Sequence, residues 1–188
     1  MRISTTLDCL GPGQQVVLTI GSFDGLHIGH QQLIRELVAR AHELRCLAAV
    51  LTFDPHPRRV LAPERRTALL STVQERDRMF TALGLDLLIM LPFTRELADT
   101  GAEDFVRHVA ACLHLTELWV GEDFRLGKGR MGDHQALQAL AGDLGYRLHI
   151  VPPVISGGKP VSSTRIRALV ESGEMHAAAV LLGREYSV

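Results

Sequence analysis

Two histidines follow an apolar segment near the start of the chain. His27 and His30 belong to the stretch TIGSFDGLHIGH, residues 19–30, whose first two residues end the largely apolar segment 15–20. Three positions apart at the start of a helix, two imidazoles share one face. Glycines here let the backbone turn tightly and approach a ligand, as at phosphate-binding helix N-termini. The stretch predicts a phosphate site; the alternative is a helix-capping turn that carries two exposed histidines.

Hydroxyl and guanidinium groups cluster near the other end of the chain. The stretch VSSTRIR, residues 161–167, places three hydroxyls before two arginines. The hydroxyls can cap a helix, an anion can bind at its N-terminus, and Arg167 can donate two hydrogen bonds to a phosphate. The alternative is an ordinary N-cap with a solvated arginine. A zinc site at the two histidines is disfavoured because no third ligand stands at a suitable spacing, and no residue is assigned to a metal.

The elements that must position these groups alternate between strands and helices. Continuous apolar runs, typical of buried parallel strands, predict strands at 15–20, 46–53, 85–93, 117–121 and 146–154. Helical spacing and helix-ending glycines predict helices at 30–44, 72–84, 101–115, 132–145, 162–173 and 175–183. This alternation predicts a doubly wound α/β fold, a Rossmann-like and mostly parallel sheet with helices on both faces.

Polar segments rich in glycine or proline fall where predicted strands end. They span residues 21–30, 54–66 and 121–133, and the three prolines of 54–66 are expected to break regular structure there. Ligands of doubly wound folds bind at the carboxyl ends of the strands. We therefore expect these segments to form one composite site.

The composition of the chain argues against several classes of function. The length of 188 residues favours one domain with a full core, and the formal net charge of −1 offers no broad basic surface for nucleic acid or an anionic membrane. No apolar run approaches the length of a membrane span, and residues 1–13 lack the apolar core of a signal peptide. Cys9, Cys46 and Cys112 lack metal or redox spacing, so we expect unpaired, mostly buried thiols and a cytoplasmic protein.

Four ordered blocks together resemble a known enzyme family. They are TIGSFDGLHIGHQQLI, LTFDPHPRRVLAP, GEDFRLGKGRMGD and VSSTRIRALVESGEMHAAAVLLGREYSV. In this order they are similar to the FAD synthetase (FMN adenylyltransferase) module of bacterial bifunctional riboflavin kinase/FAD synthetases, within the HxGH nucleotidyltransferase superfamily. The resemblance covers the chain from about residue 16 to its end. It implies that ATP with Mg²⁺ and FMN are the substrates: an FMN phosphate oxygen attacks the α-phosphorus of ATP and gives FAD and pyrophosphate, without a covalent enzyme intermediate.

The resemblance also implies roles for individual residues. The catalytic group, which binds the ATP phosphates, comprises His27, His30, Ser163, Thr164 and Arg167. Further ATP contacts are implied for Gly21, Ser22, Phe23, Gly29 and Ser162. Flavin contacts are implied for Asp54, Pro55, His56, Pro57, Asp123, Phe124 and Arg125. Lys128 and Arg130 remain open between substrate contacts and solvated charges.

The chain departs from the family pattern in two residues. Ser22 stands where the family often has Asn, and Leu126 stands where it often has Phe, which would weaken stacking near the flavin. The bifunctional members continue into a riboflavin kinase barrel. We expect residues 1–188 to form a single FMN adenylyltransferase domain with no riboflavin kinase domain present, served by a kinase module in cis or in trans.

Two other functions stay open at this point. The first is a catalytically weak paralogue that binds ATP or flavin as a regulatory module. The second is an adenylyltransferase that acts on another phosphate ester. Retention of both histidines and of the hydroxyl–arginine element favours catalysis over binding alone.

Overall fold

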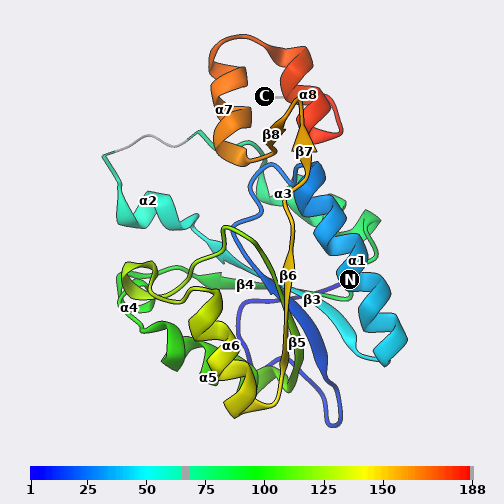
Figure 1. The fold of residues 1–188 in the computed structure, drawn as a ribbon, viewed down its shortest axis with the longest axis vertical. Helices are drawn as coiled ribbons and strands as arrows, with labels where there is room; N and C mark the ends of the chain where they lie inside the picture. The colour runs from blue at the N-terminus through cyan, green and yellow to red at the C-terminus, as the bar shows by residue number, and fades with distance from the viewer. Residues whose placement is uncertain (65–67, 187–188) are drawn as a thin grey trace.

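A six-stranded parallel sheet forms the centre of the molecule and carries helices on both faces (Figure 1). The structure is a computed structural model that describes residues 1–64 and 68–186. Its strands are β1 (Arg2–Ser4), β2 (Val16–Ile20), β3 (Leu47–Asp54), β4 (Leu87–Pro92), β5 (Leu115–Gly121), β6 (Arg147–Val151), β7 (Ile155–Ser156) and β8 (Lys159–Pro160). Its helices are α1 (Ile28–Leu44), α2 (Pro57–Leu61), α3 (Val73–Ala82), α4 (Arg95–Ala98), α5 (Ala102–Leu113), the 3₁₀ turn η1 (Lys128–Arg130), α6 (His134–Leu144), α7 (Ser163–Glu171) and α8 (Met175–Leu182).

The strand order confirms the doubly wound fold. The sheet runs β1-β4-β3-β2-β5-β6 with every neighbouring pair parallel, and β7 and β8 form a separate antiparallel hairpin. From β2 the chain moves outward through β3 and β4, then returns to place β5 and β6 on the other side of β2. Neighbouring strands β2 and β5 therefore lead to helices on opposite faces. Such a switch point opens a crevice at the carboxyl ends of the two strands.

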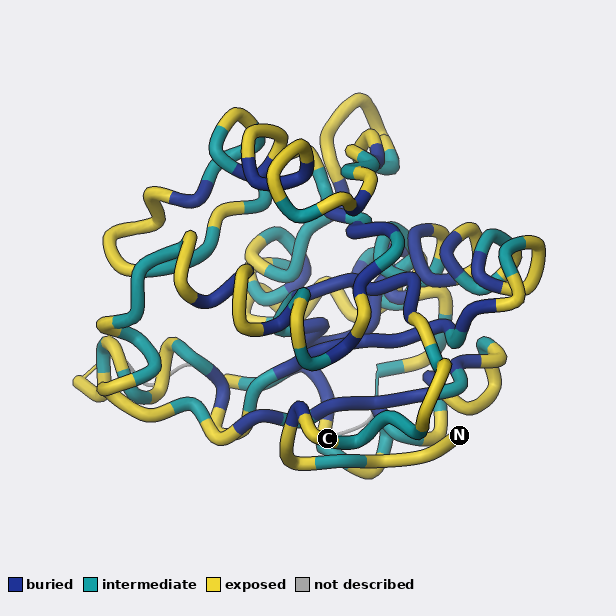
Figure 2. The backbone as a smooth tube through the Cα atoms, turned by 90° about the horizontal axis from the view of Figure 1, so that it is seen from below, coloured by how far each residue is buried: buried dark blue, intermediate teal, exposed yellow. Residues whose placement is uncertain are grey.

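Two apolar clusters hold the helices against the sheet. On one face α5 and α6 pack against strand residues such as Leu18 and Leu118, and on the other α1 and α3 pack against Val17 and Val50. Figure 2 shows the buried backbone concentrated in the central strands. Burial on both faces explains why these strands are continuous apolar runs in the sequence.

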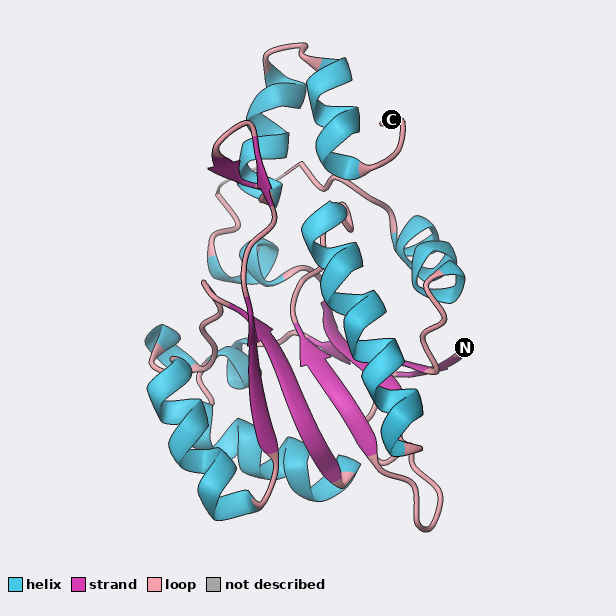
Figure 3. Ribbon diagram, turned by 45° about the vertical axis from the view of Figure 1, so that its right-hand side comes forward, coloured by secondary structure: helices cyan, strands magenta, loops and turns pink. Residues whose placement is uncertain are grey.

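A third apolar cluster joins the C-terminal helices to the rest of the molecule. Ile166 of α7 and Leu181 and Leu182 of α8 pack with Leu70 and Val161. The strand arrows in Figure 3 point toward the end of the sheet where this helix pair lies. The N-terminus of α7 is thereby held above the carboxyl ends of the strands, where the ligand site was expected.

The structure corrects several details of the prediction. Residues 54–66 are not wholly irregular, because Pro57 opens the short helix α2; Pro at the first helical turn costs no hydrogen bond. The predicted strand 146–154 ends at Val151, before two prolines. Of the three free thiols only that of Cys46 is buried, whereas Cys9 and Cys112 are partly exposed.

Other elements were not predicted, and some predicted residues are not described. The edge strand β1 and helix α4 are three and four residues long, too short for periodicity to reveal. The last two residues of the predicted segment 54–66 and the last two residues of the fourth resemblance block lie outside the described residues.

The packing of α1 yields a stability prediction. Leu37 is 0% exposed and lies in the cluster beneath this helix, so Leu37→Ala leaves a cavity and should lower the free energy of unfolding by about 2–5 kcal/mol. Urea unfolding measures this loss of stability. Val180→Ala, at a side chain that is 52% exposed, is the control and should change the value by less than about 0.5 kcal/mol. Equal effects of the two changes would contradict the assigned core.

Candidate active site

Two adjoining cavities open at the carboxyl ends of the strands. The first, of about 440 Å³, is lined by polar groups of the β2–α1 loop and the start of α7 and is called the polar cavity here. The second, of about 500 Å³, is lined mainly by aromatic and aliphatic side chains and is called the apolar cavity. The residues that line both are Ser22, Pro57, Leu61, Asp123 and Arg130. The cavities therefore meet at a junction beside the switch point of the sheet.

The loop from β2 to α1 has an unusual backbone. Phe23 and Leu26 adopt positive φ angles of 48° and 39°, and Gly25 between them has φ 78°. A Cβ atom at Gly25 would lie 2.9 Å from Cβ of Leu70, so only glycine fits there. Non-glycine residues in this conformation are uncommon and gather at functional sites. Phe23 is 4% exposed and contacts the His30 ring edge-on at 5.1 Å, which holds the strained loop in place.

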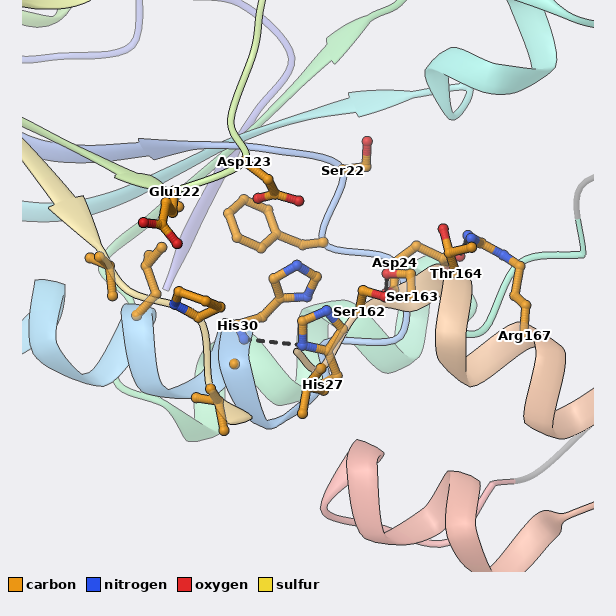
Figure 4. A pocket seen from close by; sticks show the side chains of 18 of the residues that line it. Ser22, Asp24, His27, His30, Glu122, Asp123, Ser162, Ser163, Thr164 and Arg167 are labelled. Atoms are coloured by element: carbon orange, nitrogen blue, oxygen red, sulfur yellow. Dashed lines mark hydrogen bonds and ion pairs between the residues drawn. The ribbon is translucent and has the colours of Figure 1, made fainter. Parts of the chain in front are cut away.

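His27 and His30 lie side by side at the start of α1. His27 is the N-cap, and its Nδ1 accepts a hydrogen bond of 3.3 Å from the backbone N–H of His30. The two rings stack with centroids 3.6 Å apart. Figure 4 shows the two labelled rings next to each other. Gly29 makes room for this arrangement, because a Cβ there would lie 3.3 Å from His27 Nδ1. Both imidazoles line the polar cavity, so the predicted shared face is confirmed.

Burial keeps both imidazoles neutral at pH 7. It lowers the pKa of His27 to about 4, against a smaller raising effect of the Asp123 and Asp24 carboxylates. Burial and the neighbouring His27 hold the pKa of His30 well below its usual value. Since Nδ1 of a neutral His27 accepts a hydrogen bond, its proton is on Nε2, which is left to donate. Nδ1 of His30 is buried without a partner among the described residues.

A buried carboxylate joins the β2–α1 loop to α7. Asp24 is 3% exposed; its carboxylate accepts a 2.9 Å hydrogen bond from the Leu70 backbone N–H and pairs with the Arg167 guanidinium. Ser163 Oγ donates to the Asp24 backbone carbonyl at 2.9 Å. Figure 4 shows Asp24, Ser163 and Arg167 together at the start of α7. Arg167 thus lines the polar cavity while its charge is partly neutralised by Asp24.

The other predicted residues at the start of α7 lie as expected. Ser162 is the N-cap, and its Oγ accepts from the backbone N–H of Arg165 at 3.3 Å, as the sequence predicted. Thr164 lines the polar cavity together with Ser162 and Ser163. The start of this nine-residue helix therefore presents hydroxyls and backbone N–H groups to the cavity.

The structure divides the residues predicted to bind flavin. His56 and Pro57 line the polar cavity, Phe124 and Arg125 line the apolar one, and Asp123 lines both. Asp54 and Pro55 line neither cavity.

His56 is held neutral at pH 7 by its surroundings. Burial and nearby arginines lower the pKa of His56 to about 4, and its Nδ1 accepts a hydrogen bond of 3.1 Å from the Arg58 backbone N–H.

The predicted ATP residues divide in a similar way. Phe23, Gly29 and Ser162 line the polar cavity. Ser22 lines both cavities, and Gly21 lines the apolar one. The residues predicted from the chain's two ends are therefore gathered around one composite opening, as expected.

The aromatic wall of the apolar cavity was not predicted from the sequence. The ring centroid of Phe53 lies 5.3 Å from that of Phe93 and 6.4 Å from that of Phe105. All three rings line the cavity, together with Leu97 and Leu126. Phe53 and Phe93 sit at the ends of two predicted strands, and an aromatic residue at each of two strand ends is a signal that could have found them. Phe105 comes from the facing helix α5, which only the tertiary structure brings near.

Two arginines that hold the β2–α1 loop, one buried and one partly buried, were also not predicted. Arg76 of α3 is 6% exposed and donates to the Ser22 carbonyl at 3.0 Å, and Arg184 donates to the Gly25 carbonyl at 2.7 Å. Burial lowers the pKa of both guanidinium groups, which nonetheless stay charged at pH 7. Arg76 shares a helix face with buried Phe80, four residues on, and an arginine in such an apolar stripe is a signal for a buried role.

Fold and site together define a nucleotidyltransferase-type α/β domain, with paired histidines at one helix start and a hydroxyl–arginine element at another. Comparison with protein families makes the assignment specific. The model of the family described as FAD synthetase matches residues 12–165. The chain belongs to this family.

Individual relatives agree with the family. A protein of Geobacillus thermodenitrificans, provisionally named a bifunctional riboflavin kinase/FMN adenylyltransferase, is 38% identical over 168 residues, which cover 89% of each chain. The bifunctional riboflavin kinase/FMN adenylyltransferase of Escherichia coli is 31% identical over 94% of this chain, which spans 57% of that protein. The FAD synthetase of Listeria monocytogenes is 35% identical over 92% of this chain and 70% of its own length.

A solved structure shares the fold. The crystal structure of a Streptococcus pneumoniae protein described as a macrolide-efflux protein superposes with a TM-score of 0.85 at 26% identity, over 97% of this chain and 60% of that one. Among the residues described here, no helix is long and apolar enough to cross a membrane.

The depressed pKa of His27 predicts how stability depends on pH. Because the folded state holds this imidazole neutral down to about pH 4, whereas the unfolded chain binds the proton near 6.5, the stability present above 6.5 is lost as pH falls. The loss is about 1.4 kcal/mol per pH unit for one histidine.

Urea unfolding at pH 7 and pH 5 of the natural protein and of His27→Gln tests this. The natural protein should lose about 2 kcal/mol more than the variant over this interval. Equal losses, or a His27 imidazole that titrates near 6.5 by NMR, would contradict the buried neutral state.

Proposed function

We propose that this chain is an FMN adenylyltransferase, which transfers AMP from MgATP to FMN and releases FAD and pyrophosphate. The observation that carries the proposal is the pair of adjoining cavities. One offers imidazoles, hydroxyls and a helix N-terminus to phosphates, and the other offers an aromatic wall to a flat ring system. Membership of the FAD synthetase family and the names of its relatives support the same reaction.

ATP would place its phosphates in the polar cavity. Nε2–H of His27 and a ring nitrogen of His30 can each donate to a phosphoryl oxygen, and the unpartnered Nδ1 of His30 fits a bound ligand. Ser163 and Thr164, at the N-terminus of α7, would face the outer phosphates.

FMN would place its ring system in the apolar cavity. The wall formed by Phe53, Phe93 and Phe105 can pack against an isoalloxazine ring, and Leu126 retains apolar bulk without aromatic stacking. The ring then lies on one side of the junction and the ATP phosphates on the other. The FMN phosphate is carried to the junction between them, where the two reactants must meet.

The reaction needs little covalent chemistry from the protein. An oxygen of the FMN phosphate forms a bond to the α-phosphorus of ATP, the bond from that phosphorus to the bridging oxygen of the β-phosphate breaks, and pyrophosphate leaves with the electron pair. Acceleration comes from holding the two phosphates in line and stabilising the charge that builds up on them. We assign this role to His27, His30 and Arg167, which line the polar cavity.

Mg²⁺ is expected to arrive with ATP. Glu122 and Asp123 line the polar cavity, and Mg²⁺ in proteins prefers one or two carboxylates together with phosphate oxygens. The donor set fits such an ion. Within the described residues no group of three or more acidic, histidine or cysteine side chains could hold a metal, so phosphate oxygens would complete its coordination. When bound, the ion neutralises phosphate charge.

The domain organisation, the source of FMN and the location of the protein follow from the same proposal. Residues 1–188 act as a single FMN adenylyltransferase domain, since both cavities are built from elements between β2 and α7. A riboflavin kinase module supplies FMN in cis or in trans, as the names of the bifunctional relatives suggest. The protein works in the cytoplasm, where three free thiols stay reduced.

A flavin conversion assay tests the proposed reaction. The purified chain is incubated with MgATP and FMN, and separately with MgATP and riboflavin; flavins are separated by chromatography and pyrophosphate is measured. The proposal predicts FAD and equimolar pyrophosphate from FMN, with riboflavin unchanged. A folded chain that binds ATP or flavin but releases no pyrophosphate would favour a regulatory module. Pyrophosphate only with another phosphate ester would reassign the acceptor.

The paired histidines yield a first kinetic prediction. His27→Ala and His30→Ala should each lower kcat by about 10²-fold, the usual effect of removing one donor that stabilises charge in the transition state. His42→Ala, at an exposed position of the same helix, is the matched control and should keep the natural rate. A natural rate in either cavity variant would refute its role.

The aromatic wall yields a second kinetic prediction. Phe93→Leu keeps apolar bulk but removes ring stacking worth about 1 kcal/mol, so KM for FMN should rise roughly fivefold. KM for ATP should not change, because Phe93 lies outside the polar cavity. Steady-state rates with each substrate varied in turn measure both constants, and a parallel rise in the two would argue against flavin binding at this wall.

A further inference from the structure

A short hairpin between β5 and α6 is clamped against α5. Leu126 and Gly132 pair across its base, with backbone N–H to carbonyl distances of 3.1 and 2.9 Å. Residues 126–132 are called the junction hairpin here. A Cβ at Gly127 would lie 2.5 Å from the backbone nitrogen of Ala102, and one at Gly132 would lie 2.6 Å from the Ala102 Cβ. Both ends of the hairpin therefore rest closely on the first turn of α5.

The two basic residues of the junction hairpin have different surroundings. The backbone N–H of Lys128 donates to the Thr100 carbonyl at 2.9 Å, and its Nζ forms an exposed ion pair of 3.0 Å with Asp99. Lys128 lines neither cavity. Arg130, two residues on, lines both the polar and the apolar cavity. The structure thus separates two charges that the sequence could not distinguish.

Arg130 is held in place by its backbone while its side chain stays free. Its φ angle is 60°, in the left-handed region that non-glycine residues rarely adopt. The clamped glycines on either side of it keep this conformation. Its exposed guanidinium makes no hydrogen bond or ion pair with any residue that the structure describes. A strained backbone that presents an uncommitted cation to a cavity is typical of a ligand contact.

The other basic side chains around the two cavities do not share this position. Arg167 is paired with Asp24, Arg125 donates to the Phe124 carbonyl at 2.6 Å, and Arg58 lines the polar cavity alone. Among the described residues, Arg130 is the one cation that lines both cavities. The carboxylate of Asp123 also lines both and would repel an anion at the junction; Arg130, together with the Mg²⁺ expected with ATP, would offset that charge.

We propose that Arg130 binds the phosphate of the acceptor flavin and thereby makes the site selective for FMN over riboflavin. This inference rests on the proposed function and deepens it. FMN differs from riboflavin by one phosphate, and that phosphate must lie at the junction to reach the α-phosphorus of ATP. A guanidinium donates two parallel hydrogen bonds to a phosphate, which fixes orientation as well as charge. Arg130 is a specificity-determining residue on this assignment.

The test compares flavin binding by the natural protein and three variants, without turnover. Quenching of flavin fluorescence gives Kd for FMN and for riboflavin. Arg130→Gln should raise Kd for FMN about 10- to 100-fold, as expected for loss of a hydrogen bond to a charged group, and leave Kd for riboflavin within twofold. Arg130→Lys keeps the charge and should give an intermediate Kd for FMN. Lys128→Gln, the matched control on the same hairpin, should change neither constant more than twofold.

Two results would overturn the assignment. One is that Arg130→Gln leaves the ratio of the Kd for riboflavin to the Kd for FMN unchanged. The other, in the conversion assay, is a rise in KM for ATP that exceeds the rise in KM for FMN, which would place Arg130 on the nucleotide instead.

The binding assay also separates this inference from the proposed reaction. If the natural protein makes no FAD, yet prefers FMN and loses that preference in Arg130→Gln, the reaction is wrong and phosphate recognition by Arg130 stands. If it makes FAD and the variant keeps the full preference for FMN, the reaction stands and the role of Arg130 is wrong. Unchanged thermal unfolding of the variants, expected for an exposed side chain, shows that each is folded.

Discussion

The buried carboxylate of Asp24 is the interaction on which the site depends. It accepts backbone hydrogen bonds from Leu70 and Ser71 and pairs with Arg167, so that it links the β2–α1 loop, the segment before α3 and helix α7. Removing one partner of a buried ion pair costs about 3–5 kcal/mol, because the other charge is left unsolvated. This pair holds the hydroxyls of α7 over the histidines of α1, although the two helices lie more than a hundred residues apart.

The order of the strands determines where the reactants can meet. Because β2 and β5 are neighbours at the switch point, the segments that follow them border one crevice. The segment after β2 supplies the histidines, and the segment after β5 supplies Asp123 and the junction hairpin. A polar and an apolar cavity on either side of one junction suit two substrates that differ in chemistry. Burial keeps the imidazoles of His27 and His30 neutral at pH 7.

Much of the fold and of the candidate site could be predicted from the sequence, for physical reasons that differ between elements. Strands such as β2 and helices such as α1 are long enough to show their period, so their ends were predicted within a few residues. Short elements such as β1 and α2 depend on contacts from outside their own sequence. The positions of His27, His30 and Ser162 at helix starts could be predicted because helix starts impose local rules. Phe105 and Arg76 were not predicted because their roles depend on which residues they contact across the fold.

The sequence by itself determined the alternation of strands and helices, the two helix starts that carry polar groups, and the resemblance to the FAD synthetase family, since all of these follow from local pattern. Only the tertiary structure decided which groups share a cavity. It paired Arg167 with Asp24, left Asp54 and Pro55 outside both cavities, and set Lys128 apart from Arg130. Neighbours in a sequence meet the same ligand only when packing turns them toward it, and that packing comes from distant parts of the chain.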